Sequence, residues 1–399
     1  MSKGIVFYSF QSITKKGPSG MVKYVLPLLQ NLHNLTSTPI LYKVGRIKAV
    51  TKLKNVIPLN RYYTLSLRTI NLFNKFIFKL PSYKIRYYTE RLYDYFASVS
   101  LNKPQVIIST AYLLRTTKKN KKLGGINIFL AGNPDDIEIN ALLKNEKQKH
   151  NIDFQDAYTF LPRINFIKNS IDTFDHIVTI TISEFESYSK RISQNRISFQ
   201  PNLIIPSKRQ FQNQEIEKCK KLKFCFVAHP FWLKGLNYLL DAWSKVDSDE
   251  IVLEIAGNSN DELQKILNKK FPSLKNVEYL GYVEDLNNFL RSSHVCIVPS
   301  LLDAGPTTVA EAMICGLPVI VSDGCGSRTL VKEGINGFVV QSGNSTAIYE
   351  KITWFIENQS KISVMGMAAE KTIQELQESN QDRKLAEHIV EIINILTNK

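Results

Sequence analysis

The 399-residue chain lacks the features that most quickly assign a protein to a membrane or secreted class. It has no run of about eighteen apolar residues, which is the length that a membrane-spanning helix requires. Its first residues, MSKGIVFYSFQS, contain no apolar segment of signal-peptide length and lead directly into a predicted strand. We therefore expect neither a spanning helix nor a cleaved leader.

Cysteine pairs that would indicate a metal site or a disulfide framework are also missing. The chain has five cysteines, all in its second half and none in a CxxC spacing: Cys219, Cys225, Cys296, Cys315 and Cys325. They fall at predicted strand or turn positions, so we interpret them as reduced thiols of a cytosolic protein. No signature of an RNA- or DNA-binding module occurs either.

Acidic residues are too few to balance the basic ones, and the formal net charge is +15. Part of the excess lies in residues 61–91, where aromatic and basic residues are interleaved. The basic residues are Arg61, Arg68, Lys75, Lys79, Lys84, Arg86 and Arg91, and the aromatic residues, which extend to position 93, are Tyr62, Tyr63, Phe73, Phe76, Phe78, Tyr83, Tyr87, Tyr88 and Tyr93. A second basic run extends from Lys118 to Lys122.

Three interpretations of this basic and aromatic segment stay open. Aromatic rings at headgroup depth, with basic side chains on phosphates, suit an anionic membrane surface or a membrane-bound acceptor. The same charge would attract nucleic acid, which predicts a polynucleotide affinity that falls steeply with salt. The third interpretation is an ordinary solvated helix whose aromatic residues pack inward. We favour the membrane surface over nucleic acid because no nucleic-acid module is present.

The most informative stretch is residues 299–340, PSLLDAGPTTVAEAMICGLPVIVSDGCGSRTLVKEGINGFVV. An apolar run ending at Pro299-Ser300 predicts a strand, and Thr307-Thr308 predicts a helix entrance whose free amides favour anions. Asp303 lies in the turn and Glu311 on the helix, with seven residues between them. Each acid alone is equally consistent with a helix cap or a solvated helix residue. Ligands of open α/β sheets bind at the carboxyl ends of strands, so we expect a ligand site here.

A second glycine-rich strand end follows in the same stretch. Gly316-Leu317-Pro318 followed by VIVSD predicts a helix end, a tight turn and a buried strand. The residues Asp323-Gly324-Cys325-Gly326 then form the strand end. Two such strand ends in succession indicate a cleft.

On these residues the chain resembles the retaining GT-B glycosyltransferases of the Glu-x7-Glu type, the family 4-like enzymes also called glycosyl transferases group 1. The spacing of the two acids matches, but Asp303 stands where that family usually has Glu. The resemblance implies that Asp303 approaches the donor sugar and that Glu311 binds the ribose hydroxyls. It also implies that Gly305, Thr307 and Thr308 hold sugar and phosphate oxygens.

The resemblance extends upstream to KFCFVAHPFWLKGLNYLLDAW, a predicted strand, loop and amphipathic helix. Lys234 at the helix entrance suits a diphosphate, because its ammonium lies beside free N–H groups. The family has an Arg five residues earlier, and this chain has His229 there, which is either a weaker phosphate ligand or a structural residue. By resemblance the loop that contains Tyr282 lies beside the nucleotide base.

The first half matches the family less closely. Gly17 and Gly20 bracket a glycine turn between a predicted strand and helix, and by resemblance this loop faces the donor. The turn does not match GxGxxG. Many family members have a histidine near the sugar in this domain, but this chain reads LAGNPDDIEINALL there. Asn133 and Asp135 are the acceptor-side candidates, although Asn-Pro is also a common turn starter.

Strands alternating with amphipathic helices throughout predict an α/β fold of doubly wound parallel sheets. By resemblance this is the GT-B fold, two Rossmann-like domains facing a cleft. We expect an acceptor-side domain over residues 1–206, a nucleotide-sugar-binding domain over 207–375, and a C-terminal helix over 376–399 that crosses back to the first domain. A chain of this length exceeds one ordinary core.

The tripeptide Asp247-Ser248-Asp249 matches the DxD of metal-using glycosyltransferases. It lies between a predicted helix and a predicted strand, at the end of the strands opposite to a ligand cleft. We therefore expect no metal and no cofactor beyond the donor substrate.

The resemblance as a whole implies a retaining, metal-independent hexosyltransferase that uses a nucleotide-diphosphate-sugar. The acceptor would be a glycan or lipid-linked hydroxyl in bacterial surface polysaccharide or lipopolysaccharide synthesis. We expect a cytoplasmic protein, peripheral on the inner face of the membrane, with no nucleic-acid partner. The departures at positions 229 and 303 keep open a nucleotide-sugar epimerase or an inactive nucleotide-sugar-binding subunit.

Overall fold

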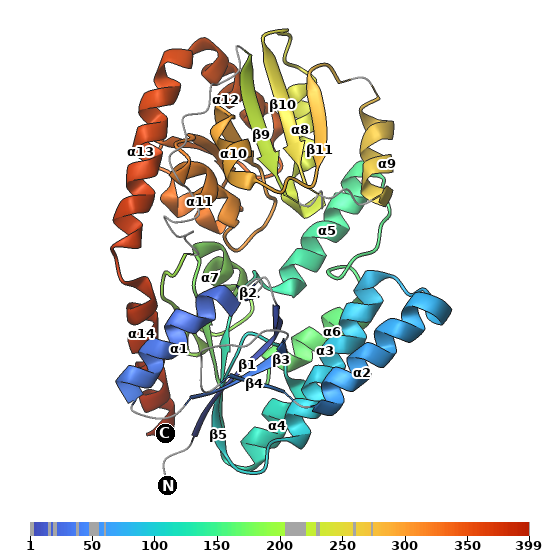
Figure 1. The fold of residues 1–399 in the computed structure, drawn as a ribbon, viewed down its shortest axis with the longest axis vertical. Coiled ribbons are helices and arrows are strands. Elements are labelled where there is room, and N and C mark those ends of the chain that lie inside the picture. Colours follow the sequence, from blue (N-terminus) through green and yellow to red (C-terminus); the bar gives the residue numbers. More distant parts are fainter. Residues whose placement is uncertain are drawn as a thin grey trace. The chain divides into compact units, whose positions relative to one another are not determined.

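The computed structural model describes residues 4–14, 17–18, 22–36, 40–47, 56–59, 61–203, 221–228, 232–257, 261–272 and 274–398. The chain forms two compact units (Figure 1). Unit 1 comprises Met1–Ile180, Glu184–Asn202 and Gln381–Lys399, and unit 2 comprises Thr181–Ser183 and Leu203–Asn380. The boundary that we expected after Pro206 lies outside the described residues.

Unit 1 is built on a largely parallel sheet. Its strands are β1 (Gly4–Thr14), β2 (Gly17–Pro18), β3 (Ile40–Ile47), β4 (Val56–Pro58), β5 (Gln105–Ser109), β6 (Ile126–Leu130), β7 (His176–Thr179) and β8 (Ile197–Phe199). They pair in the order β4-β3-β1-β5-β6-β7-β8, and every pair along this path is parallel. Among the described strands of this sheet, β2 is the one that pairs antiparallel, beside β1.

Helices cover both faces of this sheet. They are α1 (Val22–Thr36), α2 (Arg61–Phe73), the π-helix η1 (Asn74–Phe78), α3 (Ser82–Val99), α4 (Leu114–Lys122), α5 (Asp136–His150), α6 (Leu161–Ile171), α7 (Ile182–Ser189), the 3-10 helix η2 (Gln194–Arg196) and α14 (Gln381–Thr397). Side chains of α1 and α14 share one apolar cluster with the sheet, and side chains of α3 and α6 share the cluster on its other face.

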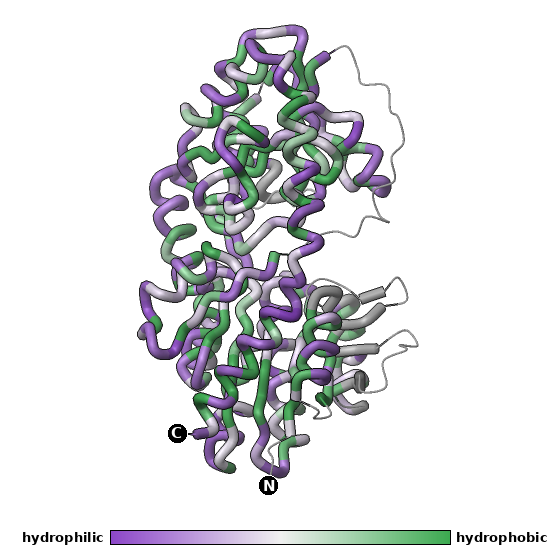
Figure 2. The backbone as a smooth tube through the Cα atoms, turned by 90° about the vertical axis from the view of Figure 1, so that its left-hand side faces the viewer, coloured by the Kyte–Doolittle hydropathy of each residue, from purple (hydrophilic) through white to green (hydrophobic). Residues whose placement is uncertain are grey.

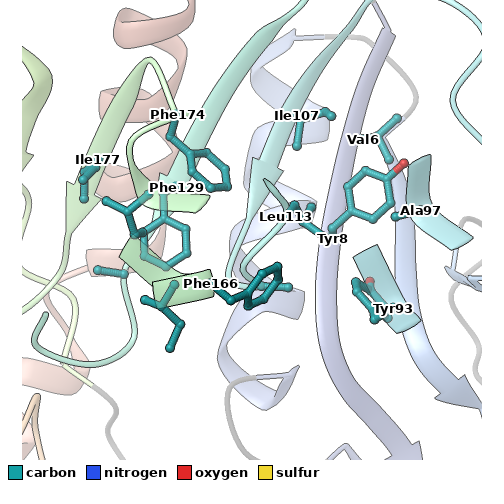
Figure 3. Packing of buried hydrophobic residues seen from close by; sticks show 14 of the residues in the cluster. Val6, Tyr8, Tyr93, Ala97, Ile107, Leu113, Phe129, Phe166, Phe174 and Ile177 are labelled. Atoms are coloured by element: carbon teal, nitrogen blue, oxygen red, sulfur yellow. The ribbon is translucent and has the colours of Figure 1, made fainter. Parts of the chain in front are cut away.

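The alternation of side chains along β1 explains why both faces are apolar. Ile5 and Phe7 enter the cluster with α1 and α14, whereas Val6 and Tyr8 enter the opposite cluster. Figure 3 shows the second cluster, to which Phe129 of β6, Phe166 of α6 and Phe174 contribute their rings. The run Ile5–Tyr8 is therefore apolar on both faces, as a parallel sheet between two helix layers requires.

The last helix of the chain belongs to unit 1 although it follows unit 2 in sequence. Leu385, Ile389 and Ile392 are each at most 5% exposed and lie in the cluster with α1. Their spacing places them on one face of α14. The N-terminal sheet is therefore completed by the C-terminal segment.

Unit 2 is a second, wholly parallel sheet. Its strands are β9 (Leu222–Val227), β10 (Ile251–Ala256), β11 (Val277–Gly281), β12 (Val295–Val298), β13 (Val319–Ser322) and β14 (Gly337–Val340), in the order β11-β10-β9-β12-β13-β14. Its helices are η4 (Trp232–Lys234), α8 (Leu236–Trp243), α9 (Asp261–Lys270), α10 (Leu286–Arg291), α11 (Thr307–Ile314), η5 (Gly326–Leu330), α12 (Ser345–Glu357) and α13 (Gln359–Gln377).

The helices of unit 2 also form two layers. Side chains of α10, α11 and α13 share an apolar cluster with β12 and β13. Trp243 of α8 and Phe355 of α12 contact Phe224 of β9 and Phe338 of β14, respectively. The predicted α/β architecture of doubly wound parallel sheets is thus confirmed in each unit.

The hydropathy of the helices agrees with this arrangement of helix layers on the sheets. In Figure 2 the helices change between hydrophobic and hydrophilic colouring within each turn, as expected of helices with one buried face. Within the described ranges, no helix is both long enough and apolar enough to cross a bilayer.

The basic and aromatic segment divides between two of its three interpretations. Tyr63 and Tyr93 are 1% exposed and pack inward, as the third interpretation predicts and against the membrane-surface interpretation that we favoured. The Tyr93 hydroxyl donates to the Lys43 carbonyl of β3, 2.9 Å away. Phe76 and Phe78, in contrast, are 65% and 62% exposed. The same segment therefore contributes to the core and also presents an apolar surface.

Candidate functional site

The carboxyl edge of the sheet in unit 2 brings a lysine and an acid together. The Lys234 ammonium contacts the Asp303 carboxylate, although Lys234 ends η4 and Asp303 lies 69 residues later, in the loop after β12. Ser300 Oγ donates to the same carboxylate oxygen at 3.3 Å. Both charged side chains are partly exposed, Lys234 by 27% and Asp303 by 14%, so a ligand can reach them.

Gly235 explains why Lys234 lies beside the end of β12. Its φ is 72°, in the left-handed region, and an added Cβ would lie 1.9 Å from the Pro299 carbonyl oxygen. Leu301 N donates to the Leu233 carbonyl at 2.8 Å and joins the two loops. Any side chain at position 235 would force the loops apart and move Lys234 away from Asp303.

The second glycine-rich strand end holds Asp303 from the other side. Asp303 N donates to the Gly324 carbonyl at 3.0 Å, and Gly326 N donates to the Asp303 carbonyl at 2.9 Å. An added Cβ on Gly326 would lie 1.5 Å from the Ala304 carbonyl oxygen. The two glycine-rich strand ends that we singled out in the sequence therefore form one compact loop pair.

The charges of Asp303 and Lys234 both act on the buried thiol of Cys325. Burial, together with the charge of the Asp303 carboxylate, raises the pKa of this thiol to about 12, and Lys234 opposes the shift. Cys325 is fully buried and therefore stays a neutral thiol at physiological pH.

Helix α11 points its N-terminus into this loop region. Its N-cap is Pro306, which makes no side-chain capping bond, so the first amides are not satisfied by a cap. The helix dipole adds partial positive charge at this end, which favours an anion. The Thr308 hydroxyl donates to the Val227 carbonyl at 3.2 Å and ties the helix to the end of β9.

Glu311 lies one helical turn after Thr307, on the same face of α11. It is partly exposed. Burial raises the pKa of Cys315 to about 12, Arg291 opposes the shift, and the Glu311 charge adds to it. Glu311 thus acts electrostatically on the buried residues behind the helix.

The remaining donor-side candidates of unit 2 lie at the same edge, with one exception. Gly305 directly precedes the α11 N-cap, and an added Cβ there would lie 3.3 Å from Ser327 Oγ. Tyr282 follows β11, whose last residue Gly281 has φ 67°, and it is 70% exposed. The exception is His229, which lies outside the described residues.

The candidate site residues of unit 1 lie in different structural environments. Gly17 lies in β2, and Gly20 is outside the described residues. Asn133 follows β6, is exposed, and lines a cavity of about 90 Å³. Asp135 is 2% exposed and acts as the N-cap of α5. Its carboxylate accepts from Ile137 N at 3.2 Å and from Arg191 Nε at 2.8 Å, so the structure gives it a structural setting.

The cavity beside Asn133 contains residues that the sequence did not single out. Arg86 and Glu90 of α3 line it together with Tyr112, at the carboxyl end of β5. Glu90 binds Arg86 at 3.0 Å and Arg163 at 2.8 Å. Arg86 and Glu90 are four residues apart, a spacing that predicts an ion pair on a helix. The sequence interpretation instead places Arg86 on a basic surface.

The DxD tripeptide lies between α8 and β10, at the amino end of the strand and away from the carboxyl edge. Glu250 N donates to Ser248 Oγ at 3.3 Å, and Asn276 Nδ2 donates to the Ser248 carbonyl at 2.9 Å, so the tripeptide forms a closed turn. In the part of the chain that the structure describes, no three His, Cys, Asp or Glu residues are arranged to hold a metal ion.

Comparison with known proteins supports a glycosyltransferase assignment. Residues 207–372 match the family model "Glycosyl transferases group 1". An uncharacterized glycosyltransferase of Haemophilus influenzae is 27% identical over 47% of this chain and 54% of its own length. The N,N'-diacetylbacillosaminyl-diphospho-undecaprenol alpha-1,3-N-acetylgalactosaminyltransferase of Campylobacter jejuni is 23% identical over 46% of this chain and 49% of its own length. The chain thus spans about half the length of these curated relatives.

Among solved structures, Anabaena HepE in complex with UDP and glucose is similar over 98% of this chain and 99% of its own, with a TM-score of 0.60 and 13% identity. At this identity the likeness shows the fold alone. The predicted GT-B fold is confirmed.

Proposed function

We propose that this chain, which has the GT-B fold and matches the glycosyl transferases group 1 family over residues 207–372, transfers a sugar from a nucleotide-diphosphate-sugar to an acceptor hydroxyl with retention of configuration. The observation that carries the proposal is the meeting of Lys234 and Asp303 beside the N-terminus of α11. A cation, a helix N-terminus and a hydroxyl-binding acid are the groups that a sugar diphosphate needs.

The donor phosphates are assigned to Lys234 and the first amides of α11. Without donor, Lys234 contacts Asp303, and a diphosphate would compete with the carboxylate for the ammonium. Donor binding would then leave the Asp303 carboxylate available to the sugar hydroxyls, and Glu311, one turn along α11, to the ribose. The UDP in complex with HepE supports a nucleoside diphosphate here.

The reaction breaks the bond between the anomeric carbon and the donor phosphate oxygen. The acceptor hydroxyl attacks the anomeric carbon from the face on which the phosphate leaves, and the proton of this hydroxyl passes to the departing phosphate oxygen. Negative charge develops on that phosphate, and preorganised donors such as Lys234 and the helix amides lower the barrier without a metal ion. No separate catalytic base is required in this scheme.

The acceptor is proposed to be a glycan or a lipid-linked oligosaccharide. The Campylobacter jejuni relative is named for a diphospho-undecaprenol substrate, which supports a lipid-linked acceptor. In unit 1, Asn133 and Arg86 line the small cavity at the carboxyl end of the strands, so they are the acceptor-side candidates. A peripheral position on the inner face of the cell membrane belongs to the same proposal.

The test is a panel of nucleotide sugars screened by thermal shift, followed by product analysis. One donor should raise the unfolding temperature, since a ligand that binds only the folded state stabilises it by mass action. Nuclear magnetic resonance of the product should show the anomeric configuration of the donor, and chelation should leave the rate unchanged. Inversion would disprove the retaining mechanism.

Turnover of the donor without an acceptor product would instead identify an epimerase. Binding without turnover would identify a nucleotide-sugar-binding subunit. The substitution of Asp303 for the usual Glu is the observation that keeps these alternatives in view.

A further inference from the structure

A rigid corner in unit 1 holds apolar side chains in solvent. The π-helix η1 connects α2 to the segment before α3, and Asn74 closes it, since Asn74 Oδ1 accepts from Leu80 N at 2.7 Å. Lys79 has φ 47°, a left-handed conformation that costs energy in a residue other than glycine. Phe76, Ile77 and Phe78 are each more than 60% exposed on this corner. Apolar patches of this kind mark interaction sites.

A groove of about 950 Å³ lies beside the corner. It is lined from four helices and the corner itself by mostly apolar side chains, among them Phe73, Phe78, Ile85, Tyr88, Leu92 and Phe166. Its volume lies at the upper end of the range of about 300–1,000 Å³ found for ligand pockets. The groove belongs wholly to unit 1 and is separate from the Lys234 site.

The exposed charge around the groove is positive. Residues 61–99 contain seven basic residues but only two acids, Glu90 and Asp94, and both acids are buried, with 6% and 4% exposure. Glu90 is paired with Arg86 and Arg163, and Asp94, which lines the groove, accepts from the amides of Arg115 and Thr116. The two acids therefore offset only part of the seven positive charges, and the face remains complementary to an anion.

Two arginines line the groove itself. The Arg91 guanidinium lies 5.7 Å from the centre of the Tyr87 ring, and the Arg115 guanidinium lies 5.0 Å from that of Tyr95. Among the described residues no carboxylate forms an ion pair with either side chain. Arg91 Nη1 also donates to the Tyr87 hydroxyl at 3.0 Å. Contact with a ring positions a guanidinium and leaves its remaining N–H groups available to phosphate oxygens.

We propose that this groove binds one hydrocarbon chain of an anionic lipid of a bilayer leaflet, with the lipid phosphate against Arg91 and Arg115. The corner formed by Phe76, Ile77 and Phe78 enters the interface beside the bound chain. The apolar groove and the unneutralised basic rim together require a ligand that is apolar and anionic at once. This inference rests on the membrane position included in the proposed function, but the lipid site involves no residue of the donor site and can be tested separately from sugar transfer.

The first experiment is co-sedimentation of the full chain with vesicles. The chain should bind vesicles of phosphatidylglycerol mixed with phosphatidylcholine at low salt, and binding should weaken as salt screens the charges. Vesicles of phosphatidylcholine alone should bind less. No binding to the anionic vesicles at low salt would overturn the proposal and leave a protein partner as the occupant of the face.

Charge variants measure the contribution of the rim. The double variant R91Q/R115Q should bind anionic vesicles about thirtyfold more weakly, since each basic residue near the membrane contributes roughly 1 kcal/mol. The control is Arg383→Gln on α14, which is also exposed and should bind like the wild type. Equal binding by the double variant and the control would contradict the role of the two arginines.

A groove variant separates chain insertion from adsorption to the surface. Thr69 lines the groove and is exposed, so Thr69→Trp narrows it without removing charge or apolar surface. Titration with dodecyl phosphate below its micelle concentration should show at least about tenfold weaker binding to this variant, whereas inorganic phosphate should bind neither protein measurably. Unchanged affinity for dodecyl phosphate would refute insertion into the groove, provided that thermal unfolding shows the variant to be folded like the wild type.

An apolar variant tests the corner with a matched control. Phe78→Ser removes a groove-lining ring that is 62% exposed, and Ile335→Ser removes a 57% exposed apolar side chain of unit 2. Only the first should weaken vesicle binding. Similar losses in both would show general apolar adsorption and would overturn the assignment. Donor binding measured by thermal shift should be unaffected in both, so failure of this inference and failure of the proposed function are distinguishable.

Discussion

Each unit contains a cluster of paired charges at the carboxyl end of its sheet, and the two clusters differ in exposure. In unit 1 the Arg163 side chain is 0% exposed, Glu90 is 7% and Asp136 is 1% exposed. In unit 2 Lys234 and Asp303 retain 27% and 14% exposure. The first cluster satisfies its charges internally, whereas the second can exchange its internal contact for a ligand. Exposure, more than the presence of an ion pair, separates a structural charge cluster from a binding site.

The pKa of Arg163 agrees with a structural role for the buried cluster. Burial lowers the pKa of Arg163, but the charges of Asp136 and Glu90 outweigh burial and raise it above its usual value. The guanidinium therefore stays charged at every accessible pH, as a permanent structural cation should.

The comparison predicts its largest effect at Arg163. Arg163→Ala leaves Asp136 buried without its ion-pair partner and Glu90 paired only with the partly exposed Arg86, which should reduce the free energy of unfolding of unit 1 by about 3–5 kcal/mol. Urea unfolding measures this loss. The control is Lys332→Ala, which breaks an exposed pair with Glu375 and should cost about 1 kcal/mol or less. Equal losses would show that burial does not distinguish the clusters.

The second effect should appear in turnover instead of stability. Lys234→Ala removes the cation proposed to stabilise the leaving phosphate, and kcat should fall by about 10²–10³-fold with little change in the unfolding temperature. Steady-state kinetics with the donor found in the screen measure the loss. Lys245→Ala, at an exposed helix pair, is the matched control. A wild-type rate in the Lys234 variant would remove the proposed donor site.

Glu311 should affect donor binding. Without its carboxylate the ribose loses a charged hydrogen bond, so Glu311→Ala should raise the donor KM by about tenfold to a hundredfold. The matched control is Glu350→Ala on α12. An unchanged KM would mean that Glu311 acts only on the helix that carries it.

Asp303 should govern selection among donors. Asp303→Asn keeps the size of the side chain but removes the charge, and it should reduce the preference for the best sugar over its epimer by about tenfold. Competition between two donors in one reaction measures this preference. A variant with unaltered preference would place the sugar elsewhere.

The smallest effect is expected at the turn that contains the DxD tripeptide. Asp247→Ala changes a surface position away from the carboxyl edge, so the free energy of unfolding should change by no more than about 0.5 kcal/mol and the rate should be unaltered. A strong loss of activity would argue for a metal-dependent reaction.

Much of the site could be predicted from sequence because it depends on local geometry. The apolar strand before Pro299, the turn with Asp303 and the helix entrance at Thr307 are adjacent in the chain, and the structure forms each of them. The family resemblance implies that Lys234 and Asp303 bind the same donor, but it does not predict the contact between them. Sequence alone could not supply the close approach of Gly235 to Pro299 that produces it.

The segment over residues 61–99 was less predictable, because its partners come from distant parts of the chain. Tyr93 is buried against Lys43 of β3, and Glu90 is neutralised by Arg163 of α6. A short segment of sequence shows only that basic and aromatic residues are interleaved. Which of these residues are buried depends on strands and helices from other parts of the chain.

The return of α14 to unit 1 ties a distant part of the chain to the first sheet. Residues 381–399 follow the whole of unit 2 in sequence, yet the first sheet needs them to cover one of its faces. Unit 1 therefore cannot bury all of its apolar surface with the residues that precede unit 2 alone. A truncation just before Gln381 would be expected to expose an apolar face of unit 1 while leaving the core of unit 2 intact.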